Sequence, residues 1–184
     1  MTEEQEQLYE TVLHAAKKGI QNTSGKNERL NVLTALLKLR QVCIHPGLLK
    51  EMPGATAVES GKFAMATEKI LDLVDEGHKI VLFSQFTEML NILQKWCNSN
   101  SIYYERIDGT VNAKDRIKFV DRFQESNKSG IFLISLKAGG VGLNLTAADY
   151  VIHLDPWWNP AIESQATDRV HRMGQQNKVI VYKL

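Results

Sequence analysis

The spacing of apolar residues changes near residue 60. In residues 1–50 they recur every three or four positions, first behind Thr2 and Gln5, whose spacing fits a capping box, and again after Gly25. Two helices are therefore expected, and the second should end where His45 precedes Pro46. The second helix is expected to pack through one apolar face that comprises Leu30, Leu33, Leu36, Leu37 and Ile44.

A different pattern follows the segment 51–61, which is rich in proline, glycine and serine and is expected to be a linker. From residue 62 to 184 short apolar runs alternate with helical patterns, and strands are expected at 79–84, 102–107, 131–135, 150–154 and 178–183. This alternation predicts an α/β fold, a parallel sheet with helices on both faces, preceded by the helical segment 1–50. Ligands of such sheets meet the loops at the carboxyl ends of the strands.

Composition and charge limit the possible functions. The 184 residues include 22 Lys and Arg against 21 Asp and Glu, so a polycationic tail is excluded although a local basic groove is not. The hydrophobic content of 43% is too high for a disordered chain, and the apolar runs are too short to cross a membrane. The acidic start lacks the apolar core of a signal peptide, and two cysteines support neither a disulfide framework nor a metal site. We expect an intracellular protein.

Sequence motifs for nucleotide binding are incomplete. The phosphate-binding loop G-x-x-x-x-G-K-[ST] is absent. The tetrapeptide at 75–78 spells D-E-G-H, which resembles the magnesium-binding box of helicases, but it follows a helix rather than a strand. Gly77 is better interpreted as the left-handed residue that closes this helix.

The segment 138–145 is rich in glycine and follows a predicted strand. It begins a dinucleotide fingerprint, but Leu145 stands where the third glycine should be, so that interpretation fails. Three glycines in four residues still allow the backbone to approach an anion, with Lys137 adding positive charge. A tight turn whose glycines serve packing alone is the alternative.

A helix should begin at Asn159 and Pro160, since asparagine caps helices and proline suits the first turn. If this helix continues, Gln165, Arg169 and Arg172 share one face, and a second stripe that packs on the sheet comprises Ile162, Ala166 and Val170. The two guanidinium groups could stabilise a phosphoryl group during transfer, or they could belong to a solvated charged face beside Asp168.

Two adjacent indoles, Trp157 and Trp158, lie just after a predicted strand. Exposed aromatic side chains there could stack on bases, and packing against a neighbouring lobe is the alternative.

Together, several segments closely resemble the second RecA-like lobe of Swi/Snf-type ATPases, the chromatin-remodelling branch of the superfamily-two helicases. The segments are FSQFT at 83–87, RIDGT at 106–110, SLKAGGVGLNL at 135–145, DPWWNP at 155–160 and QATDRVHRMGQ at 165–175. LRQVCIHP at 39–46 looks like the helical segment that precedes this lobe in the family. The resemblance covers nearly the whole chain.

The resemblance implies an ATP-driven translocase on double-stranded DNA, in which a separate first lobe holds most of the ATP and Mg²⁺. By position, the family's arginine fingers are Arg169 and Arg172, and the residues near ATP are Gly142, Asn144 and Gln165. The family's DNA-facing positions correspond to Ser84, Gln85, Gly109, Thr110, Ser135, Lys137 and Trp158. The partners implied are duplex DNA and the first lobe, with no membrane.

Three positions depart from the family pattern. Lys137 stands where many members have arginine, Trp157 adds an indole, and Met173 replaces a usual isoleucine. The paired tryptophans occur in prokaryotic and repair-type members, so a nucleosome substrate does not follow. Because this chain lacks a phosphate-binding loop, we expect one excised lobe that hydrolyses no ATP alone. A non-catalytic docking module and a lobe of an RNA helicase are the alternatives.

Overall fold

The computed structural model describes residues 1–21, 25–139, 143–157, 159–170 and 178–184. The chain forms two compact units, Met1–Thr67 and Glu68–Leu184, which are described separately. No helix in the described ranges combines the length and the hydropathy needed to span a membrane.

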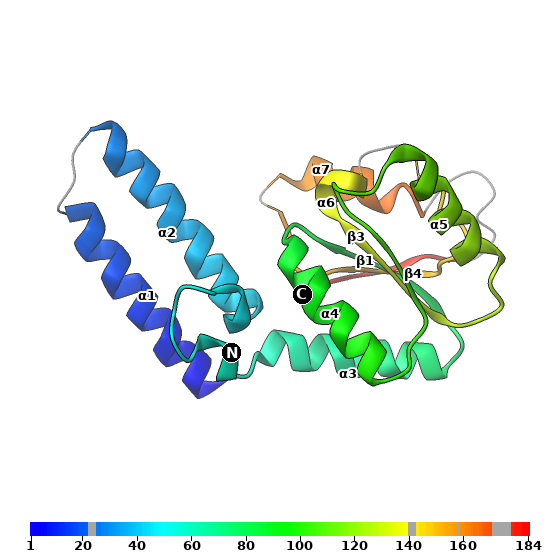
Figure 1. Cartoon of the computed structure of the whole chain (residues 1–184), viewed down its shortest axis with the longest axis horizontal. Coiled ribbons are helices and arrows are strands. Elements are labelled where there is room, and N and C mark those ends of the chain that lie inside the picture. The colour runs from blue at the N-terminus through cyan, green and yellow to red at the C-terminus, as the bar shows by residue number, and fades with distance from the viewer. Residues whose placement is uncertain (22–24, 140–142, 158, 171–177) are drawn as a thin grey trace. The chain divides into compact units, whose positions relative to one another are not determined.

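The first unit is built around two long helices, α1 (Glu3–Gln21) and α2 (Lys26–Ile44), as the spacing predicted. The capping box is confirmed, since the Gln5 amide donates to Thr2 Oγ1 at 3.2 Å and the Thr2 amide to Gln5 Oε1 at 3.4 Å. Gln5 is fully buried, and its Nε2 donates to the Val42 carbonyl at 2.6 Å while its Oε1 accepts from the Gly61 amide. Gln5 therefore joins the start of α1 to the end of α2 and to the start of α3 (Gly61–Asp75). Figure 1 shows α1 and α2 side by side.

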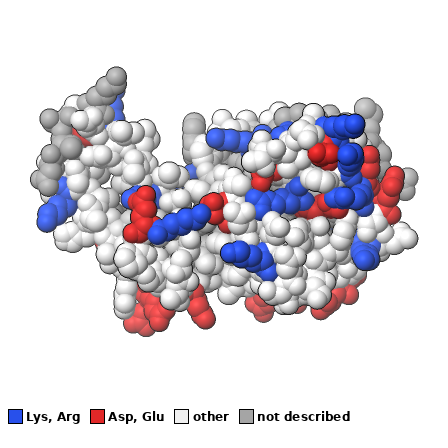
Figure 2. All heavy atoms as spheres, viewed as in Figure 1, with Lys and Arg blue, Asp and Glu red and all other residues white. Residues whose placement is uncertain are grey.

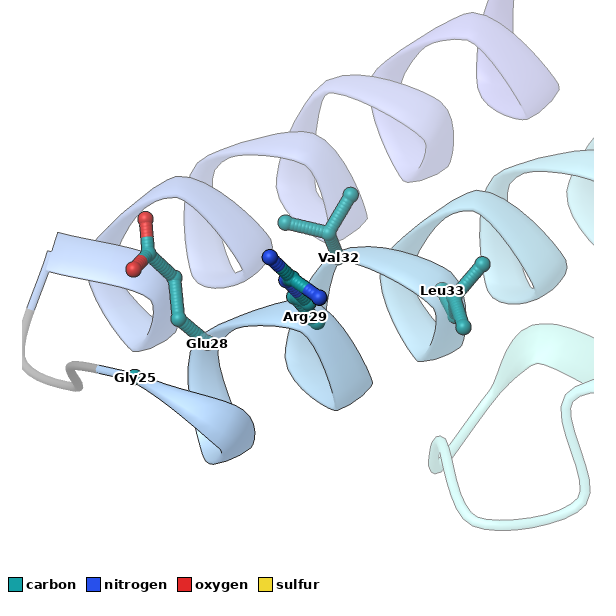
Figure 3. Close-up of a pocket in the computed structure, with 5 residues that line it drawn as sticks. All are labelled: Gly25, Glu28, Arg29, Val32 and Leu33. Atoms are coloured by element: carbon teal, nitrogen blue, oxygen red, sulfur yellow. The ribbon is translucent and has the colours of Figure 1, made fainter.

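The expected apolar face of α2 is only partly correct. Ile44 is buried, but the four leucines at 30, 33, 36 and 37 are between 46% and 65% exposed. Burial follows another stripe of α2, on which Asn31, Ala35 and Leu39 are half-buried and Val42 is buried. Asn31 and Ala35 line one hollow together with Ala15, Ala16 and Gly19 of α1. The two helices therefore approach through a different stripe of α2 from the leucines. Figure 3 shows Val32 and Leu33 projecting from α2 beside Glu28 and Arg29.

The segment 51–61 contains the 3-10 helix η2 (Ala55–Ala57) and follows η1 (Pro46–Leu48). Ala55 belongs to the core of the first unit, with Val12, Val42 and Leu49. Ser60 is also buried, and its hydroxyl donates to the Ile44 carbonyl at 2.7 Å. The segment expected to be a linker is thus anchored at Ala55 and Ser60, while most of its other residues are exposed.

The second unit is a five-stranded parallel sheet in the order β2-β3-β1-β4-β5, which confirms the predicted fold class and is RecA-like. Its strands are β1 (Lys79–Ser84), β2 (Tyr104–Ile107), β3 (Gly130–Ser135), β4 (Tyr150–His153) and β5 (Ile180–Lys183). The connecting helices are α4 (Thr87–Ser99), α5 (Ala113–Glu125), α6 (Leu136–Gly139) and α7 (Pro160–Thr167). Every pair of neighbouring strands is separated by at least one helix in the chain, as parallel pairing requires.

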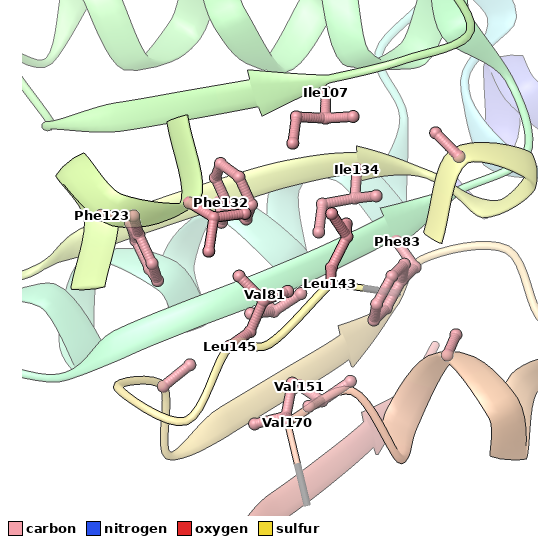
Figure 4. Packing of buried hydrophobic residues seen from close by; sticks show 14 of the residues in the cluster. Val81, Phe83, Ile107, Phe123, Phe132, Ile134, Leu143, Leu145, Val151 and Val170 are labelled. Atoms are coloured by element: carbon pink, nitrogen blue, oxygen red, sulfur yellow. The ribbon is translucent and has the colours of Figure 1, made fainter. Parts of the chain in front are cut away.

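The central strands β1 and β3 are buried on both faces, which is why their sequences are continuously apolar. In the core seen in Figure 4, Val81 of β1 lies beside Phe132 of β3 and Val151 of β4, and Phe123 of α5 stacks on Phe132 with ring centroids 5.0 Å apart. This packing fixes the register of the strands. It therefore also fixes the positions at which the loops leave their carboxyl ends.

The D-E-G-H tetrapeptide is a helix end, as expected. Gly77 has a φ of 89°, its amide donates to the Val74 carbonyl, and the His78 amide donates to the Leu73 carbonyl at 2.9 Å. This pair of bonds is the Schellman cap of α3. It lies at the amino end of β1, opposite the edge where the candidate site residues are found.

Candidate functional site

Three loops and the short helix α6 follow the carboxyl ends of adjacent parallel strands and therefore share one edge of the sheet. In the order of the strands they carry Gly109 and Thr110 after β2, Lys137 after β3, Gln85 after β1 and Trp157 after β4. Gly109, Thr110 and Lys137 are exposed and Gln85 is half-buried, whereas Trp158 lies outside the described residues. The structure thus brings most of the expected DNA-facing positions into one row.

The two serines expected to face DNA, Ser84 and Ser135, are buried instead of exposed. Ser84 is 1% exposed, and its hydroxyl accepts from the Phe86 amide at 3.1 Å and lies 3.3 Å from Asp155 Oδ2. Ser135 is also buried, and its hydroxyl accepts from the Ala138 amide at 3.4 Å. Both hydroxyls shape the turns that leave β1 and β3, so in this structure they support the segments that carry Gln85 and Lys137.

Asp155 joins two of these loops and was not among the expected site residues. It is buried after β4, where its Oδ2 accepts from the Gln85 amide at 2.9 Å and its Oδ1 lies 3.2 Å from the same nitrogen. A carboxylate that accepts a backbone amide makes a charge-assisted bond. Asp155 therefore holds the loop after β1 against the loop after β4. Its position directly after an apolar strand was the available signal in the sequence.

A second buried carboxylate, Asp108, orders the loop after β2. Its Oδ1 accepts from the Thr110 amide at 2.9 Å and from the Thr110 hydroxyl at 2.6 Å, and its Oδ2 accepts from Arg106 Nη2 at 2.8 Å. Arg106 in turn donates to Asn91 and Gln94 of α4. Burial raises the pKa of Asp108, but these hydrogen bonds and the Arg106 charge lower it more, so the net pKa lies below the ordinary value. Thr110 is thus presented from a fixed loop.

Helix α7 begins as predicted, because the Asn159 side chain accepts from the Ala161 amide at 3.1 Å and Pro160 occupies the first turn. The expectation that Gln165 and Arg169 share one helical face is wrong, since α7 ends at Thr167. The amides of Arg169 and Val170 donate to carbonyls three residues back rather than four.

Packing explains this early end of α7. Val170 is fully buried, which draws the chain towards the core, and the Arg169 carbonyl accepts from the Leu145 amide at 3.0 Å. Arg169 therefore lies in the turn after the helix. Arg172 lies outside the described residues.

The candidate nucleotide residues converge near this turn. Asn144 is exposed and directly precedes Leu145, whose amide bonds to Arg169, and Gln165 is exposed on the last turns of α7. Gly142 lies outside the described residues. Guanidinium and amide groups suit phosphate and ribose oxygens, so this donor set fits part of an ATP site.

A magnesium ion fits the described residues less well. No group of three or more histidine, cysteine, aspartate or glutamate side chains is placed to hold a metal within the described ranges. The buried carboxylates at this edge of the sheet, Asp108, Asp155 and Glu163, all accept hydrogen bonds from protein donors.

On the face shown in Figure 2, acidic and basic side chains are intermingled, in keeping with the near-neutral charge.

The inner face of α7 also differs from the expected apolar stripe. Ala166 is buried, but Ile162 is 36% exposed while its neighbour Glu163 is 3% exposed. Glu163 Oε1 accepts from the Trp157 amide at 2.5 Å, and its Oε2 accepts from Lys183 Nζ at 2.7 Å. The Trp157 side chain packs against the core of its own unit, which is neither base stacking nor packing against a neighbouring lobe.

His153, at the end of β4, supports the other end of α7. It is 2% exposed, its ring stacks on Phe83 at 5.3 Å between centroids, and its Nε2 lies 2.9 Å from Thr167 Oγ1. Burial lowers the pKa of His153 below its ordinary value, because the charged imidazolium loses solvation.

We expect this histidine to make the second unit less stable in acid. The unfolded chain takes up the proton near the ordinary pKa of about 6.5, whereas the folded chain resists it, so stability falls as the pH drops below that value. Urea denaturation at about pH 7.5 and 5.5 should show a larger loss for the wild type than for His153→Gln.

The same comparison controls for other groups. The pKa of His45 in the first unit is also lowered by burial, but His45 is present in both proteins and its effect cancels. An equal loss of stability in the two proteins would remove His153 from this pH dependence.

Comparison with known proteins matches residues 62–174, more than half of the chain, to the family described as "Helicase conserved C-terminal domain". An uncharacterized ATP-dependent helicase of Mycoplasma genitalium is 36% identical over 184 residues, which is 100% of this chain and 18% of that protein. The mouse protein "SWI/SNF-related matrix-associated actin-dependent regulator of chromatin subfamily A member 1" is 37% identical over 172 residues, which covers 89% of this chain and 16% of that protein.

The solved structure of the "Sulfolobus solfataricus SWI2/SNF2 ATPase core in complex with dsDNA" matches with a TM-score of 0.83 at 35% identity. The match covers 100% of this chain and 38% of that chain. The chain thus spans less than a fifth of the length of the two curated relatives and well under half of this structure.

Proposed function

Because this chain belongs to the helicase conserved C-terminal domain family, in its SWI2/SNF2 branch, we propose that it is the second lobe of an ATP-dependent double-stranded-DNA translocase. In this proposal the lobe begins at residue 62, the segment 1–50 is its helical appendage, and 51–61 connects the two. A separate first lobe supplies the phosphate-binding loop and the ligands of Mg²⁺, so this chain alone hydrolyses no ATP.

The observation that carries the proposal is the row of loops at the carboxyl edge of the sheet, which ends next to α7 and Arg169. The side-chain nitrogen of the half-buried Gln85 is buried, whereas Thr110 and Lys137 are exposed and offer a hydroxyl and an ammonium group. Such groups contact phosphate oxygens and position a duplex without reading its sequence. The buried carboxylates Asp108 and Asp155 hold the loops after β2 and β1 in place by accepting hydrogen bonds from their backbone amides.

In the proposed nucleotide site this chain contributes cations and hydrogen-bond donors. Arg169 and Arg172 act as arginine fingers on the phosphates held by the first lobe, and Gln165 supports the same nucleotide. Gly142 and Asn144 lie on its ribose side. ATP with Mg²⁺ supplies the phosphoryl group to be transferred, and arginine side chains stabilise the charge that develops on it.

Replacing Lys137 by alanine should weaken binding of duplex DNA and reduce its salt dependence. Each phosphate that a cation neutralises contributes about −0.9 to the slope of log affinity against log salt. We expect the slope for Lys137→Ala to be shallower by roughly 1, with sequence preference unchanged. Fluorescence anisotropy of a labelled duplex over a salt series measures both quantities.

Lys128 provides a matched control, because it is an exposed lysine in the loop before β3, at the opposite edge of the sheet. Lys128→Ala should keep the wild-type slope. Equal slopes for Lys137→Ala and the wild type would take Lys137 off the DNA path. Tighter binding of RNA than of duplex DNA would instead favour the lobe of an RNA helicase.

A further inference from the structure

The only glutamate of α7 occupies an unusual position for a charged residue. Glu163 lies on the inner face of the helix at 3% exposure, beside the buried Ala166, while the apolar Ile162 faces outward. A buried carboxylate is unfavourable unless hydrogen bonds and an opposite charge compensate for its lost solvation. An apolar residue at this position would fill the same space without that requirement.

The partners of Glu163 come from two segments outside α7. One carboxylate oxygen accepts from the Trp157 amide, in the loop after β4, and the other accepts from Lys183 Nζ of β5. The carboxylate therefore bonds to the backbone of the loop that carries the two tryptophans. Burial raises the pKa of Glu163, but the bonds from Lys183 and Trp157 lower it more, so the group stays charged at neutral pH.

These bonds belong to a continuous series across the edge of the sheet. The Gln85 amide bonds to Asp155, the Trp157 amide bonds to Glu163, and α7 leads from Glu163 to the turn that carries Arg169. At the far end of α7, Thr167 bonds to His153 of β4. The helix is thus held at both ends while its first turn is tied to the loop in front of it.

We propose that Glu163 is a positioning residue that couples DNA contact at the loop after β4 to the placement of Arg169 at ATP. The inference rests on the proposed function, and it adds a residue that touches neither DNA nor nucleotide. Displacement of the loop by DNA moves the Trp157 amide, and the charge-assisted bond transmits that movement to the first turns of α7. Such coupling requires a direct test rather than an argument from proximity alone.

Two substitutions at Glu163 separate the bond from the charge. Glu163→Gln keeps an oxygen that can accept from the Trp157 amide but loses the ion pair with Lys183. Glu163→Ala loses both. Ser164→Ala, at an exposed position of the same helix, controls for changes in helix propensity.

The first measurement is amide hydrogen exchange in the 184-residue chain, which needs no ATPase activity. Glu163→Ala should speed exchange at the Trp157 amide by about tenfold or more, because the bond that protects it is removed. Glu163→Gln and Ser164→Ala should stay near the wild type. Unchanged exchange in Glu163→Ala would overturn the inference.

The second measurement uses the complete ATPase that carries this lobe. Glu163→Ala should lower kcat in the presence of duplex DNA by about 10- to 100-fold, as expected when a catalytic group is misplaced, with KM for ATP changed by less than about twofold. Glu163→Gln should restore most of the DNA-stimulated kcat, which a purely electrostatic role would not allow. If Glu163→Ala does not fold, the double variant Glu163→Gln, Lys183→Met tests the same point, because it keeps the acceptor and should retain stimulation.

The outcomes separate this inference from the proposed function. A wild-type enzyme that duplex DNA does not stimulate would refute the proposed function. If duplex DNA stimulates the wild type but the alanine, glutamine and double variants lose this stimulation equally, the coupling role of Glu163 is refuted while the proposed function stands. Full stimulation in Glu163→Ala would refute the coupling role in the same way.

Discussion

Alanine at Arg169 or at Arg172 is expected to lower ATP turnover by the complete two-lobed enzyme by about 10³- to 10⁵-fold, the range known for arginine fingers. ATP binding should remain largely intact, because the first lobe holds most of the nucleotide in the proposed arrangement. Steady-state kcat at saturating ATP and duplex DNA, together with equilibrium binding of a fluorescent ATP analogue, measures both effects.

Backbone contacts and a buried neighbour hold the turn that carries Arg169. The turn after α7 is held by the Arg169 carbonyl, which accepts from the Leu145 amide, and by the buried Val170, neither of which depends on the guanidinium group. Arg169→Lys keeps the charge but loses the planar fork, so it should recover only part of the activity. Asp168→Asn, at an exposed neighbouring position, is the control. Normal hydrolysis by Arg172→Ala or Arg169→Ala would remove that residue from the fingers.

The second large effect is expected from Asp155→Ala. This change leaves the Gln85 amide and the buried Ser84 hydroxyl without their carboxylate partner. Loss of a charged acceptor from buried donors lowers the free energy of unfolding by about 2 to 4 kcal/mol. Because the loop after β1 then loses its attachment to the loop after β4, duplex DNA should bind more weakly as well. Urea denaturation and anisotropy of a labelled duplex measure the two effects.

Asp155→Asn is the matched control for that prediction. Its oxygen can still accept from the Gln85 amide, whereas its amino group faces the Ser84 hydroxyl, so we expect less than half of the alanine effect. Wild-type stability in Asp155→Ala would show that the two loops are held by other contacts.

Much of the fold could be predicted because local signals and tertiary packing agree. The apolar runs that became β1 and β3 are buried on both faces, the Thr2 and Gln5 pair forms its capping box, and Gly77 closes α3. The row of loops also followed from the sequence, since parallel strands place their carboxyl ends at one edge.

Other features of the candidate site could not be predicted from spacing. A helical period continues through Arg169 in the sequence, yet α7 ends at Thr167, because the burial of Val170 and the bond between Leu145 and Arg169 redirect the chain. The leucines of α2 keep a helical period and are still exposed, since a different stripe of α2, from Asn31 to Val42, is the one that is buried. Periodicity in the sequence identifies a helix, but the element that packs against the helix decides which of its faces is buried.

The sequence by itself determined the parallel sheet, its helices and the family resemblance, because each depends on short-range spacing or on a local motif. The residues proposed to meet ATP and DNA follow from that resemblance. Only the tertiary structure decided that Ser84, Asp155 and Glu163 are buried supports, because they bond to residues far away in the sequence. Asp155 is 70 residues from Gln85, and Glu163 is 20 residues from Lys183. From the sequence alone, a carboxylate is expected to lie on the polar surface. It becomes a structural link when folding surrounds it with amides and a lysine.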